Sequence, residues 1–218
     1  CRHNRVPLIF SSSREVYGDI HRYITEEQHA DFSFTESPYS ASKVAGEALV
    51  YSYARCYGVR YIVFRFSNVY GRYDNDIERM ERVIPLFIQR MRQGLPVTVY
   101  GSEKMLDFTY VDDCVSGIRA GIERLLDGRV QNQTINLAYG QGNTLVRMAE
   151  LIAEALQVAA HITVEPAKRV GEVSRYIADI SRAVELLDYQ PQVPLAEGIR
   201  RAVAWSNAWA ARVPPGEQ

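Results

Sequence analysis

The sequence predicts an α/β protein, namely the C-terminal part of a doubly wound parallel sheet joined to a smaller α/β lobe. Apolar runs over residues 6–12 and 59–66 are typical of strands buried on both faces of a parallel sheet. A helical pattern over residues 39–57 separates them, which is the strand–helix–strand order of such a sheet. Polar residues follow both strands, at the edge where open α/β sheets bind their ligands.

Proline and glycine mark the ends of several elements. Pro38 favours a helix start and Gly58 a helix end, so the first helix covers residues 39–57. Asn143 or Thr144 caps a helix that reaches about Leu156. Apolar periodicity predicts further helices over residues 83–93, 111–126, 180–187 and 195–211, and strands over 97–100, 134–138 and 161–165. We expect loops over residues 19–37 and over the charged residues 72–82.

Composition excludes several classes of protein. The 218 residues are 47% hydrophobic and 23% charged with a net charge of −1, which is typical of a globular protein and gives no basic surface for nucleic acid. No run of 18 apolar residues occurs, so we expect no membrane span. The three cysteines and four histidines have neither a disulfide pattern nor metal-ligand spacing, so we expect no metal and a cytoplasmic location.

Tyr39 and Lys43 are four residues apart in the first predicted helix, so their side chains lie on one face. A cation beside a phenol favours the phenolate, which is useful for proton transfer at neutral pH. Taken alone, this pair also fits a surface helix that happens to carry one tyrosine and one lysine.

The strand ends on either side of this helix make the pattern more specific. Ser11-Ser12-Ser13 ends the first strand and Phe66-Ser67-Asn68 ends the second. With these motifs in this order, the chain resembles the extended short-chain dehydrogenase/reductase family. The closest resemblance is to its NAD-dependent sugar-nucleotide epimerases and dehydratases, and it extends to about Trp205. It implies a Rossmann-like fold, NAD as cofactor and a nucleotide-sugar substrate.

The resemblance also implies a division of the chain. Residues 1–72, with returning segments near 105–140, correspond to the second half of an NAD-binding Rossmann domain, and residues 73–218 mostly to an interleaved substrate-binding lobe. No Gly-x-Gly-x-x-Gly occurs in the sequence, although a dinucleotide-binding βαβ unit opens with this turn. We therefore expect the first half of the fold, on the order of a hundred residues, to be missing. We expect the complete protein to be a homodimer.

The resemblance assigns roles to individual residues. Tyr39 is the general acid/base, Ser13 helps it to exchange a proton with a sugar hydroxyl, and Lys43 holds the nicotinamide ribose. The expected cofactor-binding residues are Ser11, Tyr39, Lys43, Phe66 and Ser67, and the expected substrate-binding residues are Glu15, Asn68, Tyr100 and Arg169. The family mechanism passes a hydride to NAD, rotates the keto-sugar and returns the hydride, which implies a 4-epimerase. The alternatives are structural: Asn68 could close a turn, Tyr100 could pack in the core and Arg169 could lie on the surface.

At two positions the sequence departs from the family pattern, and these departures limit the reactions and the substrate contacts that we expect. Arg14 stands where the dehydratases carry the Asp of an Asp-Glu pair, and a guanidinium stays protonated, so classical 4,6-dehydration is disfavoured. Glu15 is kept, as in nucleotide-sugar decarboxylases, so a decarboxylase or a reductase remains an alternative, as does an inactive fragment that serves only as a binding module. Leu106 replaces an Arg that relatives often use on the diphosphate.

Overall fold

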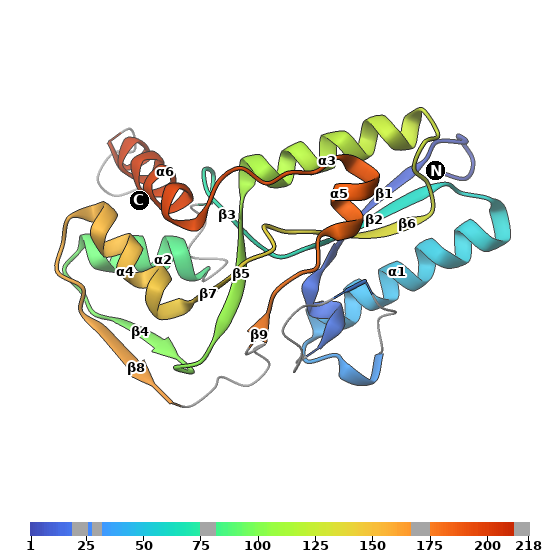
Figure 1. Ribbon diagram of the computed structural model, residues 1–218. Coiled ribbons are helices and arrows are strands. Elements are labelled where there is room, and N and C mark those ends of the chain that lie inside the picture. The colour runs from blue at the N-terminus through green and yellow to red at the C-terminus, as the bar shows by residue number, and fades with distance from the viewer. Residues whose placement is uncertain (19–25, 28–31, 75–81, 167–174, 212–218) are drawn as a thin grey trace.

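The computed structural model describes residues 1–18, 26–27, 32–74, 82–166 and 175–211 (Figure 1). Strands β1 (Leu8–Ser13), β2 (Tyr61–Phe66) and β6 (Gln133–Leu137) form a parallel sheet in the order β1-β2-β6. Helix α1 (Pro38–Tyr57) covers one face of this sheet, and α3 (Val111–Leu126) and α5 (Ser181–Leu187) cover the other (Figure 1). The predicted α/β fold with a parallel sheet is confirmed.

Short strands and three helices build the rest of the described chain. Strand β5 (Met105–Tyr110) pairs in parallel with β3 (Asn68–Tyr70) and β9 (Arg175–Tyr176), and antiparallel with β7 (Gly142–Thr144). Strand β4 (Val97–Tyr100) pairs with β8 (Ile162–Glu165). Helices α2 (Val83–Arg92), α4 (Leu145–Leu156) and α6 (Leu195–Ala210) lie on this side of the molecule (Figure 1).

Side-chain caps explain why two of the helices begin where they do. The Ser37 hydroxyl accepts from the Ser40 N–H at 3.1 Å, and the Ser40 hydroxyl accepts from the Ser37 N–H at 3.0 Å, which forms a reciprocal capping box before α1. Gly58 ends α1 in the left-handed conformation, with φ 65°. The Thr144 hydroxyl accepts from the Arg147 N–H at 3.1 Å and starts α4. The predicted boundaries of both helices are confirmed.

Two buried apolar clusters stabilise the chain. One lies between the parallel sheet and helices α3 and α5, and the other fills the space among α2, α4, α6 and β5. Gly117 and Gly121 let α3 approach the sheet, because an added Cβ would lie 2.4 Å from Leu137 or from Phe64. Helix α3 therefore packs directly against side chains of β2 and β6.

Two expected loops fall partly outside the described residues. Of residues 19–37, the structure describes 26–27 and 32–37, and Phe32–Phe34 form a 3₁₀ helix, η2. Of the charged residues 72–82, positions 75–81 lie outside the described chain. Within the described residues, no helix has the length and apolar character needed to cross a membrane.

Candidate active site

A cleft of about 560 Å³ opens at the C-terminal ends of β1 and β2. Side chains from β1, α1 and the β2–β3 region meet in it, together with the 3₁₀ helix η1 (Arg14–Tyr17) that follows β1. Most of the residues that the sequence singles out line this cleft: Ser11, Ser13, Glu15, Tyr39, Phe66, Ser67 and Asn68. The volume suits a small-molecule ligand.

Tyr39 and Lys43 lie one turn apart on α1 beside the end of β1. The Lys43 Nζ is 5.3 Å from the centroid of the Tyr39 ring and donates a hydrogen bond to the Ser11 carbonyl at 3.0 Å. The Tyr39 side chain is about half exposed, with a relative exposure of 50%. The lysine is thus fixed between the strand end and the phenol, and the phenol stays accessible to a ligand.

Ser13 serves as the N-cap of η1, because its hydroxyl oxygen accepts from the Glu15 N–H at 3.2 Å. This bond uses the oxygen as an acceptor and leaves the hydroxyl proton for another partner. The Ser37 hydroxyl donates to the Glu15 carboxylate at 3.4 Å. Ser13 therefore caps the turn and still lies in the cleft, so this structural contact is compatible with its expected catalytic role.

Asn68 is held from two sides. The Arg14 Nε and Nη2 donate to its amide oxygen at 3.3 and 3.2 Å, and its amide nitrogen donates to the Asp107 carbonyl at 2.9 Å. The Ser67 and Thr109 hydroxyls share a hydrogen bond of 2.6 Å, which joins β5 to the end of β2. The sequence indicates Asn68 but not its contact with Arg14, because the two residues are 54 positions apart.

Asp107 is completely buried on β5 and connects three segments. Its carboxylate accepts from the backbone N–H groups of Tyr139 at 3.1 Å, Gly140 at 2.9 Å and Ala178 at 3.3 Å. Burial raises the pKa of Asp107 to about 7, although these N–H groups act in the opposite direction. Asp107 thereby fixes the segments after β6 and β9 next to the strand that holds Asn68.

A buried ion pair attaches α1 to the sheet. The Arg65 Nη2 and Nε lie 2.6 and 2.9 Å from the Glu47 carboxylate, which also accepts from Ser12 at 2.5 Å and Tyr51 at 2.9 Å. Burial raises the pKa of Glu47, but the bonds and charge of Arg65 outweigh it, so the pKa lies below its ordinary value. This network was not predicted from the sequence, and it positions the helix that carries Tyr39.

The described part of the structure does not place the other predicted substrate-binding residues in this cleft. Tyr100 lies at the end of β4 and is not among the described residues that line the cleft. Leu106 is 4% exposed and packs in the apolar cluster among α2, α4, α6 and β5. Arg169 lies outside the described residues. Within the described chain, no cluster of His, Cys, Asp or Glu could hold a metal ion.

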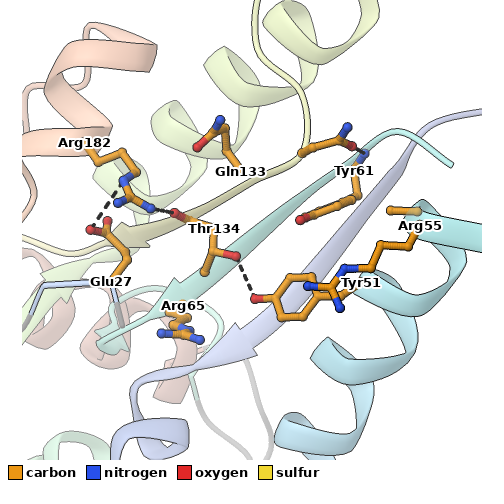
Figure 2. Close-up of a pocket in the computed structure, with 10 residues that line it drawn as sticks. Glu27, Tyr51, Arg55, Tyr61, Arg65, Gln133, Thr134 and Arg182 are labelled. Carbon is orange, nitrogen blue, oxygen red and sulfur yellow. Dashed lines mark hydrogen bonds and ion pairs between the residues drawn. The ribbon is translucent and has the colours of Figure 1, made fainter. Parts of the chain in front are cut away.

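A second cleft, of about 610 Å³, lies beside α1 over β2 and β6 (Figure 2). Figure 2 shows that its polar groups bond to one another: Tyr51 to Thr134 at 2.7 Å, and Arg182 to the Glu27 carboxylate at 3.7 Å. The described residues that line it include neither Ser13 nor Tyr39, which both line the cleft at the strand ends. Although it is the larger cleft, the cleft at the strand ends is the candidate active site.

Comparisons with known proteins give a family match and several similar proteins. Residues 1–138 match the NAD dependent epimerase/dehydratase family. A dTDP-glucose 4,6-dehydratase of Streptomyces antibioticus is 32% identical over 95% of this chain and 60% of its own length. The structure of a UDP-N-acetylglucosamine 4-epimerase from Methanobrevibacter ruminantium M1 is 28% identical, with a TM-score of 0.85 over 96% of this chain and 66% of that one.

A third similar protein has been solved with both cofactor and substrate. The UDP-glucuronic acid 4-epimerase of Bacillus cereus, in complex with UDP-glucuronic acid and NAD, is 25% identical. Its TM-score is 0.81, and the match covers 92% of this chain and 61% of that one. The chain spans 60–63% of the length of the first curated relatives that it matches.

Proposed function

Because the chain belongs to the NAD dependent epimerase/dehydratase family, we propose that the protein is an NAD-dependent nucleotide-sugar epimerase that acts at C4 of a UDP-sugar. The observation that carries the proposal is the arrangement of Tyr39 and Lys43, with the Lys43 Nζ 5.3 Å from the Tyr39 ring in front of the strand-end serines. Similar proteins named as UDP-sugar 4-epimerases support this choice.

The residues present fit the nicotinamide end of NAD. The Lys43 ammonium group, bound to the Ser11 carbonyl at 3.0 Å, would hold the ribose hydroxyls, and Phe66 and Ser67 would lie next to the ring. When bound, NAD supplies a hydride acceptor that later returns the hydride. The sequence has no Gly-x-Gly-x-x-Gly to hold the pyrophosphate, so these residues account for one end of the cofactor only.

The proton chemistry follows from three side chains. The Tyr39 side chain is exposed to the cleft, so its oxygen, as the phenolate, takes the proton of the sugar C4 hydroxyl and, as the resulting phenol, gives it back. The Lys43 ammonium group lies 5.3 Å from the centroid of this ring, so a positive charge stands beside the group that moves the proton. Ser13 donates a hydrogen bond from its hydroxyl to the Tyr39 oxygen or to the sugar C4 oxygen.

In this proposal, residues 1–72 and the segments near 105–140 belong to the cofactor-binding part, and most of residues 73–218 hold the substrate.

A second candidate is a nucleotide-sugar decarboxylase or reductase. It is favoured by Glu15, whose carboxylate lines the cleft beside Ser13. Dehydration is disfavoured although several relatives are named as dehydratases, because Arg14 occupies the position of the acid and also lines the cleft.

We also propose that the complete protein is a homodimer in the cytoplasm. One exposed face of α1 has small or apolar, uncharged residues, which suits close packing of helices: Ala41, Ala45, Ala48, Leu49, Ser52 and Tyr53. Cys56, on the same helix, is an exposed free thiol, and exposed thiols persist in a reducing compartment.

Product analysis tests the proposed reaction. The protein, expressed from its intact gene and supplied with NAD, is incubated with UDP-, GDP- and dTDP-sugars, and the products are separated and examined by NMR. We expect inversion at C4 without change in mass. Loss of carbon dioxide would identify the decarboxylase, loss of water would identify a dehydratase, and no product from any sugar would support the inactive alternative.

A further inference from the structure

We propose that Arg14 selects nucleotide sugars whose sugar ring carries a carboxylate, by pairing its guanidinium group with that carboxylate in the strand-end cleft. The inference rests on the proposed function, because it names the substrate class of the same site. It concerns binding specificity and requires no step in the chemistry.

The backbone places Arg14 next to the reacting groups. Arg14 is the first residue of η1, directly after Ser13, and both line the cleft together with Tyr39. The turn is fixed by the bond from the Glu15 N–H to the Ser13 hydroxyl at 3.2 Å and by the bond from the Gly18 N–H to the Glu15 carbonyl at 3.2 Å. A sugar whose C4 hydroxyl meets Ser13 and Tyr39 therefore has its ring substituents beside Arg14.

Two donors of the Arg14 guanidinium group bond to a neutral acceptor, which a carboxylate can displace. Nε and Nη2 both donate to the single amide oxygen of Asn68, at 3.3 and 3.2 Å. These distances are at the long end for such bonds, whereas charge-assisted bonds to a carboxylate are shorter and about twice as strong. The Tyr176 ring, whose centroid is 5.7 Å from the guanidinium carbon, and Asn68 together orient the group. A carboxylate that took these donors from the Asn68 amide would thus gain stronger bonds from a group that is already oriented.

The charges around the cleft also favour a role for the Arg14 cation in binding a substrate carboxylate. The Glu15 carboxylate lines the same cleft, so a second carboxylate on the substrate would be repelled unless a cation lay nearby. Among the described lining residues the other cation is Arg82, which lies 3.6 Å from the Asp74 carboxylate. Arg14 is therefore the lining cation best placed to offset the repulsion at the sugar end.

Titration calorimetry with three ligands tests the inference. UDP-glucuronic acid, UDP-glucose and UDP are titrated into the NAD-supplied protein from its intact gene, as wild type, Arg14→Gln and Arg14→Lys. We expect the wild type to bind UDP-glucuronic acid roughly 10-fold or more tightly than UDP-glucose. Arg14→Gln should lower the affinity for UDP-glucuronic acid by about 10–100-fold, because the charged bond is lost. The affinity for the other two ligands should fall by less than about 3-fold. Arg14→Lys should keep part of the preference.

Arg82→Gln is the matched control, since it removes the other lining cation and should leave the ratio of the two sugar affinities unchanged. Equal binding of both sugars by the wild type would overturn the inference. Equal weakening of all three ligands by Arg14→Gln would also overturn it and would place Arg14 on the diphosphate. If Arg14→Gln does not fold, the wild-type preference and Arg14→Lys decide the question. Selective binding without turnover would refute the proposed function and leave this inference standing.

Discussion

Glu47→Gln should destabilise the fold strongly, because it breaks the buried ion pair that attaches α1 to the sheet. The substitution keeps the length of the side chain but removes its charge, so the Arg65 guanidinium loses its counter-charge in the interior. Both side chains are 1% exposed, and the bonds from Arg65 to Glu47 are 2.6 and 2.9 Å long. Because α1 carries Tyr39 and Lys43, the same change should loosen the candidate active site.

The expected magnitude follows from burial. Removing one partner of a buried pair costs about 3–5 kcal/mol, and Gln keeps one acceptor oxygen for either the Ser12 or the Tyr51 hydroxyl, so we expect about 3 kcal/mol. In a domain of this size, 1 kcal/mol corresponds to roughly 2–4 °C in Tm, so Tm should fall by about 6–12 °C.

Thermal unfolding followed by circular dichroism measures this change. The double substitution Glu47→Gln with Arg65→Met removes both charges and should recover part of the lost stability. Glu197→Gln is the surface control, because Glu197 pairs with Arg200 and Arg201 in solvent, and it should shift Tm very little. If Glu47→Gln unfolds within about 1 °C of the wild type, the ion pair does not hold α1 and the reasoning is wrong.

Four further predictions concern cofactor binding, the support of the cleft and substrate binding. Lys43→Ala should weaken NAD binding by calorimetry and lower turnover, because it removes the group that contacts the Ser11 carbonyl and faces the Tyr39 ring. Asp107→Asn should lower stability in urea titrations by about 1–3 kcal/mol, because the amide nitrogen cannot accept from the backbone N–H groups. Burial raises the pKa of Asp107 from 3.8 to about 7, so its contribution to stability is complete below about pH 4 and is lost as the pH rises through 7. Arg169→Ala should raise KM by a factor worth about 1.5–3 kcal/mol, because Leu106 cannot bind a diphosphate and Arg169 would carry more of it.

Each of these predictions has a result that would contradict it. Unchanged NAD affinity in Lys43→Ala would remove Lys43 from the cofactor site. An Asp107→Asn protein as stable as the wild type would show that its backbone contacts contribute little. Stability that does not change between pH 4 and 7 would contradict the raised pKa of Asp107, and an unchanged KM in Arg169→Ala would move the diphosphate elsewhere.

Local signals explain why much of the fold could be predicted from the sequence. Helices α1 and α4 have Pro38, Gly58 or Thr144 at their ends, and strands β1 and β2 begin as apolar runs, so each depends on adjacent residues. Strands β3, β7 and β9 are only two or three residues long and pair with β5, so no local period reveals them. The buried polar residues of β5, such as Asp107, have partners that only the folded chain supplies.

The candidate site, like the fold, could be predicted only in part from the sequence. The motifs around Ser13, Tyr39 and Asn68 indicated residues that the structure brings into one cleft, because parallel strands end at a common edge. The residues that orient them, Arg14 and Glu47, were not predicted in this role. Glu47 meets Arg65 across 18 positions and Arg14 meets Asn68 across 54, and no spacing rule within a helix or strand relates such pairs.

The most direct test of the central claim follows deuterium at C4 of a UDP-sugar. The NAD-supplied protein from the intact gene is incubated with substrate deuterated at C4, and the product is examined by NMR and mass spectrometry. Removal and return of one hydride predicts a product of inverted C4 configuration that keeps its deuterium. Tyr39→Phe should slow its formation by roughly 10²–10⁴-fold while NAD binding survives. A product that has exchanged deuterium with water, or near-full turnover by Tyr39→Phe, would contradict the account.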